Sequence, residues 1–157
     1  MQCMDISSLD LRKSDLRKTK LSGLDFSNMD LTGANLSGVS LKGTNFNGAI
    51  LRNANLSGAQ MDGFRDKHNK LSIVNIVGAD LRGADLSKAS LRQADFTGSN
   101  LTNANLSGAI LRNACFRNSI LSEANLEGAD LSKVFFAGSN MKGANFNHTD
   151  CQGIKFN

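Results

Sequence analysis

Histidine and cysteine, which are common in catalytic and metal sites, are scarce in this chain. The candidates for acid–base, nucleophilic or metal-binding chemistry are two histidines, His68 and His148, and three cysteines, Cys3, Cys115 and Cys151. Neither histidine has a recognisable nucleophile or metal ligand near it in the sequence, and the cysteines form no Cys-x-x-Cys pair. The sequence therefore predicts a protein that is not an enzyme, with no catalytic residue, no cofactor and no metal site.

Basic residues are the second kind of side chain that could bind a ligand. They form two clusters, Arg12, Lys13, Arg17, Lys18 and Lys20 in the first and Arg65, Lys67, His68 and Lys70 in the second. Such clusters are typical of surfaces that bind polyanions, and we take them as the possible interaction surface. Aspartates interrupt both clusters, at positions 5, 10 and 15 and at positions 62 and 66. Since no exposed aromatic platform accompanies them, nucleic acid is not the expected partner.

Length and composition indicate one soluble globular domain over residues 1–157. The chain has 18 Lys and Arg against 14 Asp and Glu, a net charge of +4, and 40% of its residues are hydrophobic. Its apolar runs are far shorter than the roughly 18 residues that cross a bilayer, so no membrane association is expected. The first residues show no basic segment followed by an apolar one, and a cytoplasmic location is the expectation.

A period of five residues organises the whole chain. From Ile6 to Phe156, 30 of the 31 residues at every fifth position are apolar, and Asp66 is the exception. Of the 15 alanines, 14 lie two places before one of these positions, and all 15 glycines lie two places after one. This spacing matches neither the helical period of 3.6 nor the strand period of 2. It predicts short extended segments, each placing two side chains inward, separated by tight turns.

The phenylalanines indicate how many segments make one coil. Phe96, Phe116, Phe136 and Phe156 are 20 residues apart, which is four repeats. A four-sided coil would stack these rings over one another at about the 4.8 Å spacing of neighbouring strands. The pattern therefore favours a solenoid with a square cross-section.

The individual repeats resemble those of a known family. Segments 34–38, 54–58, 84–88 and 104–108 read Ala-Asn-Leu-Ser-Gly or Ala-Asp-Leu-Ser-Lys, and they are similar to the A(D/N)LXX unit of pentapeptide repeat proteins. The resemblance extends over nearly the whole chain. It implies an all-β fold, a right-handed quadrilateral parallel β-helix of about seven to eight coils of 20 residues.

The pattern breaks at about residues 62–70, where Asp66 holds an inward position. Burying an unpaired carboxylate would cost several kcal/mol, so we favour a loop that leaves the coil, with period five resuming at Leu71. A ten-residue excursion would place six of the seven centrally positioned phenylalanines on one side. The near-duplicate segments 48–54 and 108–114 favour the opposite reading, because 60 residues is three uninterrupted coils.

Function is less determined by the sequence than fold. We expect a rigid protein-interaction scaffold without chemistry of its own, with another protein as partner. Four outward positions carry apolar residues that could mark a partner surface or be scattered: Ile50, Ile110, Ile120 and Phe135. Cys151 replaces Leu at an inward position and is expected to be buried.

The resemblance also implies an alternative function, a DNA mimic that binds DNA gyrase. The net charge of +4 argues against it, and so does the lack of the C-terminal dimerisation segment that such family members carry. Because both ends of the sequence read as repeats without caps, we expect either an end-to-end homodimer or a place within a longer polypeptide.

Overall fold

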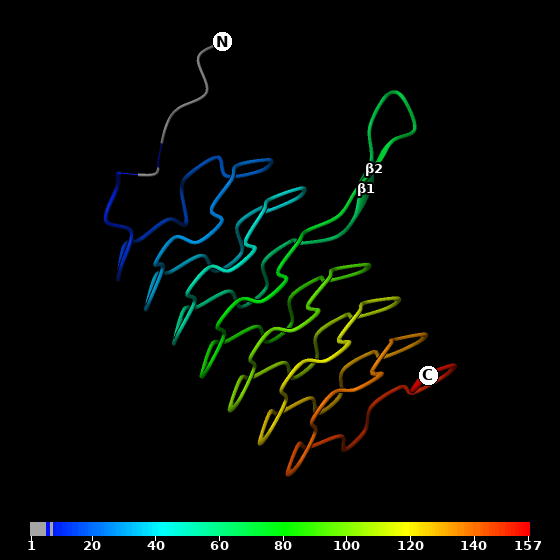
Figure 1. Ribbon diagram of the computed structural model, residues 1–157. Coiled ribbons are helices and arrows are strands. Elements are labelled where there is room, and N and C mark those ends of the chain that lie inside the picture. Colours follow the sequence, from blue (N-terminus) through cyan, green and yellow to red (C-terminus); the bar gives the residue numbers. More distant parts are fainter. Residues whose placement is uncertain (1–5, 7) are drawn as a thin grey trace.

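The computed structural model describes residue 6 and residues 8–157, and the chain winds through it as a rod of stacked coils (Figure 1). Parallel β-bridges join residues 20 apart, as from Asp15 to Asn35 and from Asn105 to Asn125. One coil therefore takes four pentapeptides. The described residues contain no helix, and the predicted all-β coil of stacked pentapeptides is confirmed by these bridges.

One repeat, residues 104–108, shows why the period produces this coil. The N–H of Leu106 donates to the carbonyl of Asn125 in the next coil at 2.7 Å, and the N–H of Asn125 donates to the carbonyl of Ala104 at 2.9 Å. The turn closes when the N–H of Ala109 donates back to the carbonyl of Leu106 at 3.0 Å. Gly108 lies in this turn with φ of 63°, a left-handed conformation that glycine adopts without a Cβ clash.

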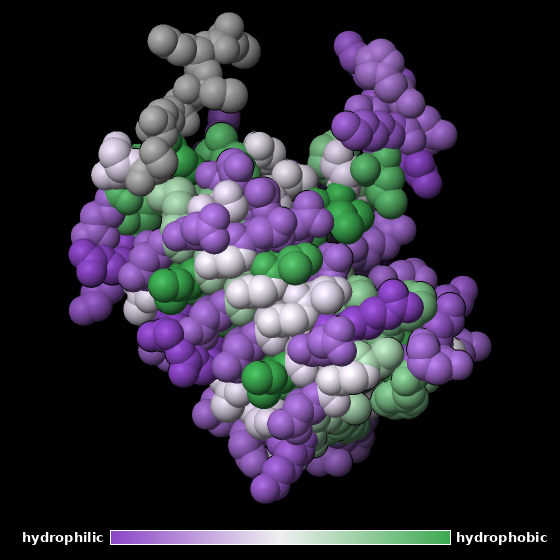
Figure 2. All heavy atoms as spheres, in the orientation of Figure 1, coloured by the Kyte–Doolittle hydropathy of each residue, from purple (hydrophilic) through white to green (hydrophobic). Residues whose placement is uncertain are grey.

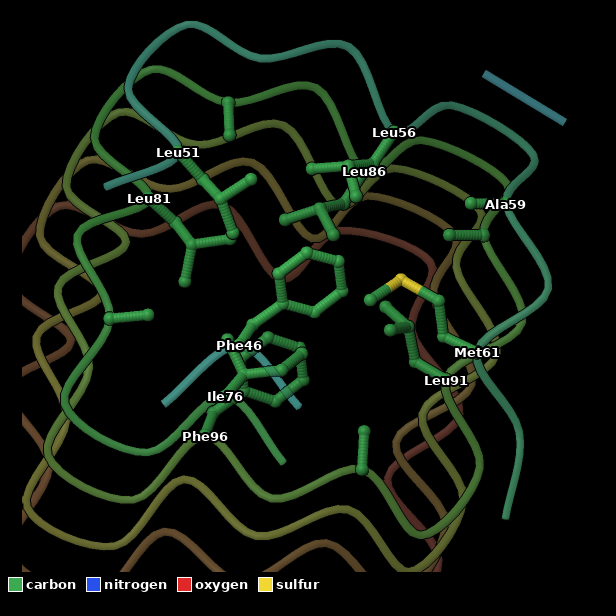
Figure 3. Packing of buried hydrophobic residues seen from close by; sticks show 14 of the residues in the cluster. Phe46, Leu51, Leu56, Ala59, Met61, Ile76, Leu81, Leu86, Leu91 and Phe96 are labelled. Carbon is green, nitrogen blue, oxygen red and sulfur yellow. The ribbon is translucent and has the colours of Figure 1, made fainter. Parts of the chain in front are cut away.

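The core is a set of ladders of identical or similar side chains. From Phe26 to Met61 and from Ile76 to Phe136, the central apolar residues and the Ala two places before them are almost completely buried. In the phenylalanine ladder the ring centroids of Phe96 and Phe116 lie 4.6 Å apart and those of Phe116 and Phe136 lie 5.4 Å apart, both stacked. Ile76 continues the ladder between Phe46 and Phe96 (Figure 3).

The bridges divide the surface of the rod into four faces, which we name by what they carry. Each name refers to the pentapeptides around its bridged positions: the phenylalanine face at 25, 45, 75, 95, 115, 135 and 155; the isoleucine face at 10, 30, 50, 80, 100, 120 and 140; the asparagine face at 15, 35, 55, 85, 105, 125 and 145; and the hairpin face at 20, 40, 60, 90, 110, 130 and 150.

A β-hairpin interrupts the hairpin face. Its strands are β1 (Phe64–Arg65) and β2 (Leu71–Ser72), which pair antiparallel with Phe64 opposite Ser72 and Arg65 opposite Leu71. In Figure 1 the hairpin leaves the row of turns and extends toward the end of the rod where the chain begins. It is thus the one departure from the coil among the described residues.

The bridges also locate where the hairpin is inserted. Across it the bridge spacing rises from 20 to 30, as from Gln60 to Ser90. Gly63 still donates its N–H to the carbonyl of Arg92 at 2.9 Å, and Val74 is buried at the next small-residue position. Residues 64–73 are therefore the excursion, so the break lies slightly later than residues 62–70.

Two expectations about this region need correction. Leu71 is not inward: it lies in β2 and is 40% exposed. Leu71 still falls on every fifth position of the sequence because the insertion is ten residues long, which is a multiple of five. The near-duplicate segments 48–54 and 108–114 lie on different faces, because Ile50 bridges to Asp80 whereas Ile110 bridges to Ser90 and Asp130. The similarity of these two segments therefore does not mean that they lie on the same side of the rod.

Within the described part of the chain, no helix has the length and hydrophobicity needed to cross a bilayer.

Candidate interaction surface

The hairpin is anchored at its root by a carboxylate. Ser90 Oγ donates to Asp62 Oδ1 and Oδ2 at 2.7 and 2.8 Å, and the N–H of Arg92 donates to Asp62 Oδ1 at 3.0 Å. The Arg92 guanidinium donates to Ser90 Oγ at 2.7 Å and lies 3.3 Å from Asp62 Oδ2. These bonds tie the residue where the chain leaves the coil to the coil that follows.

The other side of the root packs on the coil that precedes it. A Cβ at Gly43 would lie 3.0 Å from Phe64 Cε1 and 3.8 Å from Ser72 Cβ, so the hairpin sits directly over this turn. The Phe64 ring also walls a hollow of about 300 Å³, whose other lining residues are Ser22, Gly23 and Lys42. A glycine corner therefore provides the floor on which the hairpin rests.

The tip of the hairpin is shaped by Asp66. Its Oδ1 accepts hydrogen bonds from the N–H of His68 at 2.8 Å and of Lys70 at 3.0 Å. Asn69 has φ of 61° in the same turn, and its carbonyl accepts a bond from Arg65 Nη1 at 2.9 Å. Asp66 is thus exposed and forms the turn at the tip. It is not buried, although it occupies one of the positions that point inward in regular repeats.

The two arginines of the first basic cluster are paired with neighbouring aspartates. Arg12 and Arg17 each make two side-chain bonds, at 2.9 and 2.7 Å, to Asp10 and Asp15 respectively. The side-chain bonds from the arginine, followed by its backbone N–H, lower the pKa of each carboxyl to about 2. All four side chains are more than half exposed, so these pairs are local features of the surface.

The structure separates the residues of the first cluster and joins one of them to the second. Arg12 and Lys13 belong to the isoleucine face, and Arg17 and Lys18 belong to the asparagine face. Lys20 belongs to the hairpin face, from which the second cluster projects. The second cluster stays together on the hairpin, where all its members are exposed: Arg65, Lys67, His68 and Lys70.

The histidines and cysteines form no reactive constellation among the described residues. His68 and His148 are both exposed, on the hairpin and on the asparagine face. Cys115 is half-buried, with its Sγ 3.3 Å from Thr97 Oγ1. Residues 6 and 8–157 bring no three His, Cys, Asp or Glu side chains together as a metal site, and Cys3 lies outside them.

Cys151 contradicts the expectation of burial. It is exposed because it lies in the last described coil, where no further coil covers its inward side. Together with Phe146 and Phe156 it lines an apolar hollow of about 480 Å³ at this end of the rod. Phe156 itself is 64% exposed. End-to-end pairing through such a surface stays a prediction.

The outward apolar residues do not form one patch. Ile50 and Ile120 share the isoleucine face but are separated along it by Asp80 and Asn100, and Ile110 lies on the hairpin face. Phe135 lies on the phenylalanine face with Arg117 Cζ 5.0 Å and Lys155 Nζ 4.5 Å from its ring centroid. Sequence analysis missed this cation–π cluster, although the 18- and 20-residue spacings contained it.

Comparison with known proteins agrees with this architecture. The family model of pentapeptide repeats matches in eight copies, over residues 10–48, 30–65, 79–118 and 119–157. The pentapeptide repeat protein Rfr23 from the cyanobacterium Cyanothece 51142 is 26% identical with a TM-score of 0.52, covering 82% of this chain and 91% of its own. None of the curated proteins compared with this chain matches it.

Two further solved structures have lower TM-scores. HetL from the cyanobacterium Nostoc sp. strain PCC 7120, described as involved in heterocyst differentiation regulation, is 29% identical with a TM-score of 0.47, covering 95% of this chain and 83% of its own. QnrB1, a plasmid-mediated fluoroquinolone resistance protein, is 22% identical with a TM-score of 0.43, covering 92% and 87%. The match of the family model over most of the sequence shows that the chain belongs to the pentapeptide repeat family.

Proposed function

We propose that this protein is a non-enzymatic, rigid interaction scaffold and that the β1–β2 hairpin is its main contact element, with another protein as partner. The observation that carries the proposal is how the hairpin is held. Asp62 binds the following coil and Phe64 covers Gly43 of the preceding coil, while residues 65–70 are exposed. A fixed root and an accessible tip are what a recognition loop on a rigid scaffold requires.

The scaffold is proposed to be a right-handed quadrilateral β-helix of about seven to eight coils. Membership of the pentapeptide repeat family supports the handedness. The regular 20-residue bridges support the length, since they continue from Asp15 to Lys155 with one interruption. A rod of this kind holds its faces in fixed relative positions, because each coil is bonded to its neighbours along every face.

Gyrase binding by DNA mimicry is the alternative function, and the surface does not favour it. A mimic needs a continuous acidic strip, whereas several outward aspartates of this rod are paired with arginines. Asp80 accepts bonds from Arg52 and Arg82, and Asp130 accepts one from Arg112. Gyrase inhibition therefore stays an untested alternative, which a supercoiling assay with the purified protein addresses.

Deleting the hairpin tests the scaffold proposal. Removing residues 64–73 joins Gly63 to Val74 and leaves Met61-Asp62-Gly63-Val74-Asn75-Ile76, an uninterrupted repeat sequence. We expect host proteins retained by the full chain to be lost by the deletion variant, as measured by quantitative mass spectrometry. The control carries Asn105→Ala and Ser107→Ala on the asparagine face and should retain them. Equal retention by the deletion variant and the full chain would overturn the proposal.

A further inference from the structure

The net positive charge of the chain is concentrated on one side of the rod. The hairpin and the hairpin face carry eight Lys and Arg against four Asp, a difference of +4 that equals the net charge of the whole chain. The other ten Lys and Arg are matched by ten Asp and Glu elsewhere. The basic residues of this side are Lys20, Lys42, Arg65, Lys67, Lys70, Arg92, Arg112 and Lys133.

The four aspartates of this side are already engaged. Asp62 binds Ser90 and Arg92, and Asp130 binds Ser132 and Arg112. Asp66 and Asp150 accept backbone N–H groups in their own turns. Within the described residues the lysines of this side make no ion pair: Lys20, Lys42, Lys67, Lys70 and Lys133.

The hollow under the hairpin combines charge with apolar surface. Its wall is the Phe64 ring, 38% exposed, and its rim carries the Lys42 side chain. Gly23 provides a floor without a side chain. Leu71, which pairs with Arg65, lies on the other face of the hairpin and does not line this hollow. The hydrophilic hairpin stands away from the body of the rod in Figure 2.

From these features we infer that the hairpin face binds an acidic peptide segment of the partner protein, with an apolar side chain of that segment in the hollow beside Phe64. The inference rests on the proposed function and names the chemistry of the partner. Lysines without a protein carboxylate attract acidic side chains, and the hollow, at about 300 Å³, has room for an apolar one.

A peptide fits this surface better than a nucleic acid. Arg92 and Arg112 are held by Asp62 and Asp130, and Asp66 lies among the lysines of the tip, so a regular phosphate backbone would meet carboxylates along its path. The hollow has the dimensions of a side chain, and the single ring at its wall offers no row of stacking platforms.

The test uses the full chain and a labelled synthetic peptide of about 12 residues built from Asp, Glu and Leu, with fluorescence anisotropy at about 50 mM salt. A matched peptide with Asn and Gln in place of the acids controls for charge. Lys42→Glu and the deletion of residues 64–73 should each weaken binding about five- to tenfold. Lys142→Glu, at the equivalent repeat position on the isoleucine face, should change it less than twofold.

Three results would overturn the inference: equal binding of the amide peptide, equal weakening by Lys142→Glu and Lys42→Glu, or tighter binding of duplex DNA than of the acidic peptide. The outcome is separable from that of the scaffold proposal. Suppose that deleting the hairpin abolishes capture of host proteins, while the acidic peptide does not bind or binds the Lys42→Glu variant equally well. The scaffold proposal is then supported, and the inference of an acidic partner is wrong.

Discussion

The asparagine face and the hairpin face are made from the same repeat, yet they differ in how the polar groups of neighbouring coils are hydrogen-bonded. On the asparagine face, Asn105 donates through Nδ2 to Asp85 at 3.2 Å and Asn145 donates to Asn125 at 3.1 Å, so each coil binds the next. On the hairpin face the ladder opens between Lys42 and Asp62. The N–H of Gly23 donates to the backbone carbonyl of Lys42, whereas the N–H of Gly43 donates to no backbone carbonyl among the described residues.

This difference shows how a solenoid gains a recognition surface. Where neighbouring coils satisfy one another, the outward side chains are occupied in stabilising the rod. Where an insertion separates two coils, side chains such as Phe64 and Lys42 become available to a partner. The experiments below ask how far the two regions are energetically independent.

Truncating one ring in each region should give the largest contrast. Phe116→Ala removes a completely buried ring stacked between Phe96 and Phe136, and we expect the free energy of unfolding to fall by about 3–5 kcal/mol. Phe64→Ala removes a ring that is 38% exposed and should cost less than about 1.5 kcal/mol. Urea denaturation of both variants is the measurement. Similar losses would show that the hairpin belongs to the core.

Deleting residues 64–73 should leave the rod intact or strengthen it. Closing a ten-residue loop costs about 2 kcal/mol of chain entropy, which the deletion returns, against the loss of the Phe64 contact with Gly43. The free energy of unfolding should therefore stay level or rise by up to about 2 kcal/mol. Thermal denaturation by circular dichroism measures this.

The control deletion has the same length within the regular rod. Removing residues 99–108 would turn every later coil by half a turn and place Phe116 away from Phe96. That variant should be strongly destabilised. If deletion of the hairpin destabilises the chain as strongly as the control deletion does, the hairpin is part of the folding unit.

Alanine at two turn glycines should separate backbone strain from hairpin docking. Gly43 and Gly58 have φ of 67° and 63°, so each substitution should cost about 1 kcal/mol. A Cβ at Gly58 meets nothing within 4 Å, whereas at Gly43 it would press on Phe64. Only Gly43→Ala should speed tryptic cleavage after Lys67 and Lys70. Equal cleavage rates in the two variants would contradict the docking geometry.

Changing Asp66 should act on the hairpin alone. Asp66→Leu removes the acceptor of two backbone N–H groups in the tip, a local cost of about 1 kcal/mol. Global unfolding in urea should shift by less than about 0.5 kcal/mol, since the hydrogen bonds of Asp66 stay within the hairpin. Hydrogen exchange at His68 and Lys70 should accelerate. A large gain in stability would instead place residue 66 in the core.

A further small effect is expected in the pH dependence of an ion pair that joins two coils. Hydrogen bonds from Arg82, and then from Arg52, hold the pKa of Asp80 well below its usual value of 3.8, against an opposing effect of partial burial. Because the folded pKa is the lower one, this stabilisation is complete above about pH 5 and is lost as pH falls below about 4.

Comparison with a neutral variant isolates that contribution. The difference in unfolding free energy between the native chain and Asp80→Asn, below about 1 kcal/mol for a partly exposed pair, should shrink steadily as pH falls below about 4. A difference that stays constant with pH would show that hydrogen bonding without charge accounts for it.

Much of the fold was predictable from sequence because the repeat is local. An inward Leu, a small residue two places earlier and a Gly or Asn two places later each satisfy a requirement within five residues, and the observed φ values at Asn28, Asn53 and Asn103 fit that turn. The candidate site was less predictable. It joins residues inside a ten-residue insertion to residues of the regular coil, as with Phe64 and Gly43, and the period of the repeat does not pair them.

The sequence by itself determined the four-sided coil, the inward ladders and the neighbourhood of the break, since all of these follow from a period. Only the tertiary structure decided that residues 64–73 leave the coil, that the two phenylalanine series share one ladder, and that the net charge gathers on the hairpin face. The physical reason is that ten residues leave a period of five unchanged while turning every later coil by half a turn. Which pentapeptides share a face is decided by the pairing between coils, and the period alone does not contain this information.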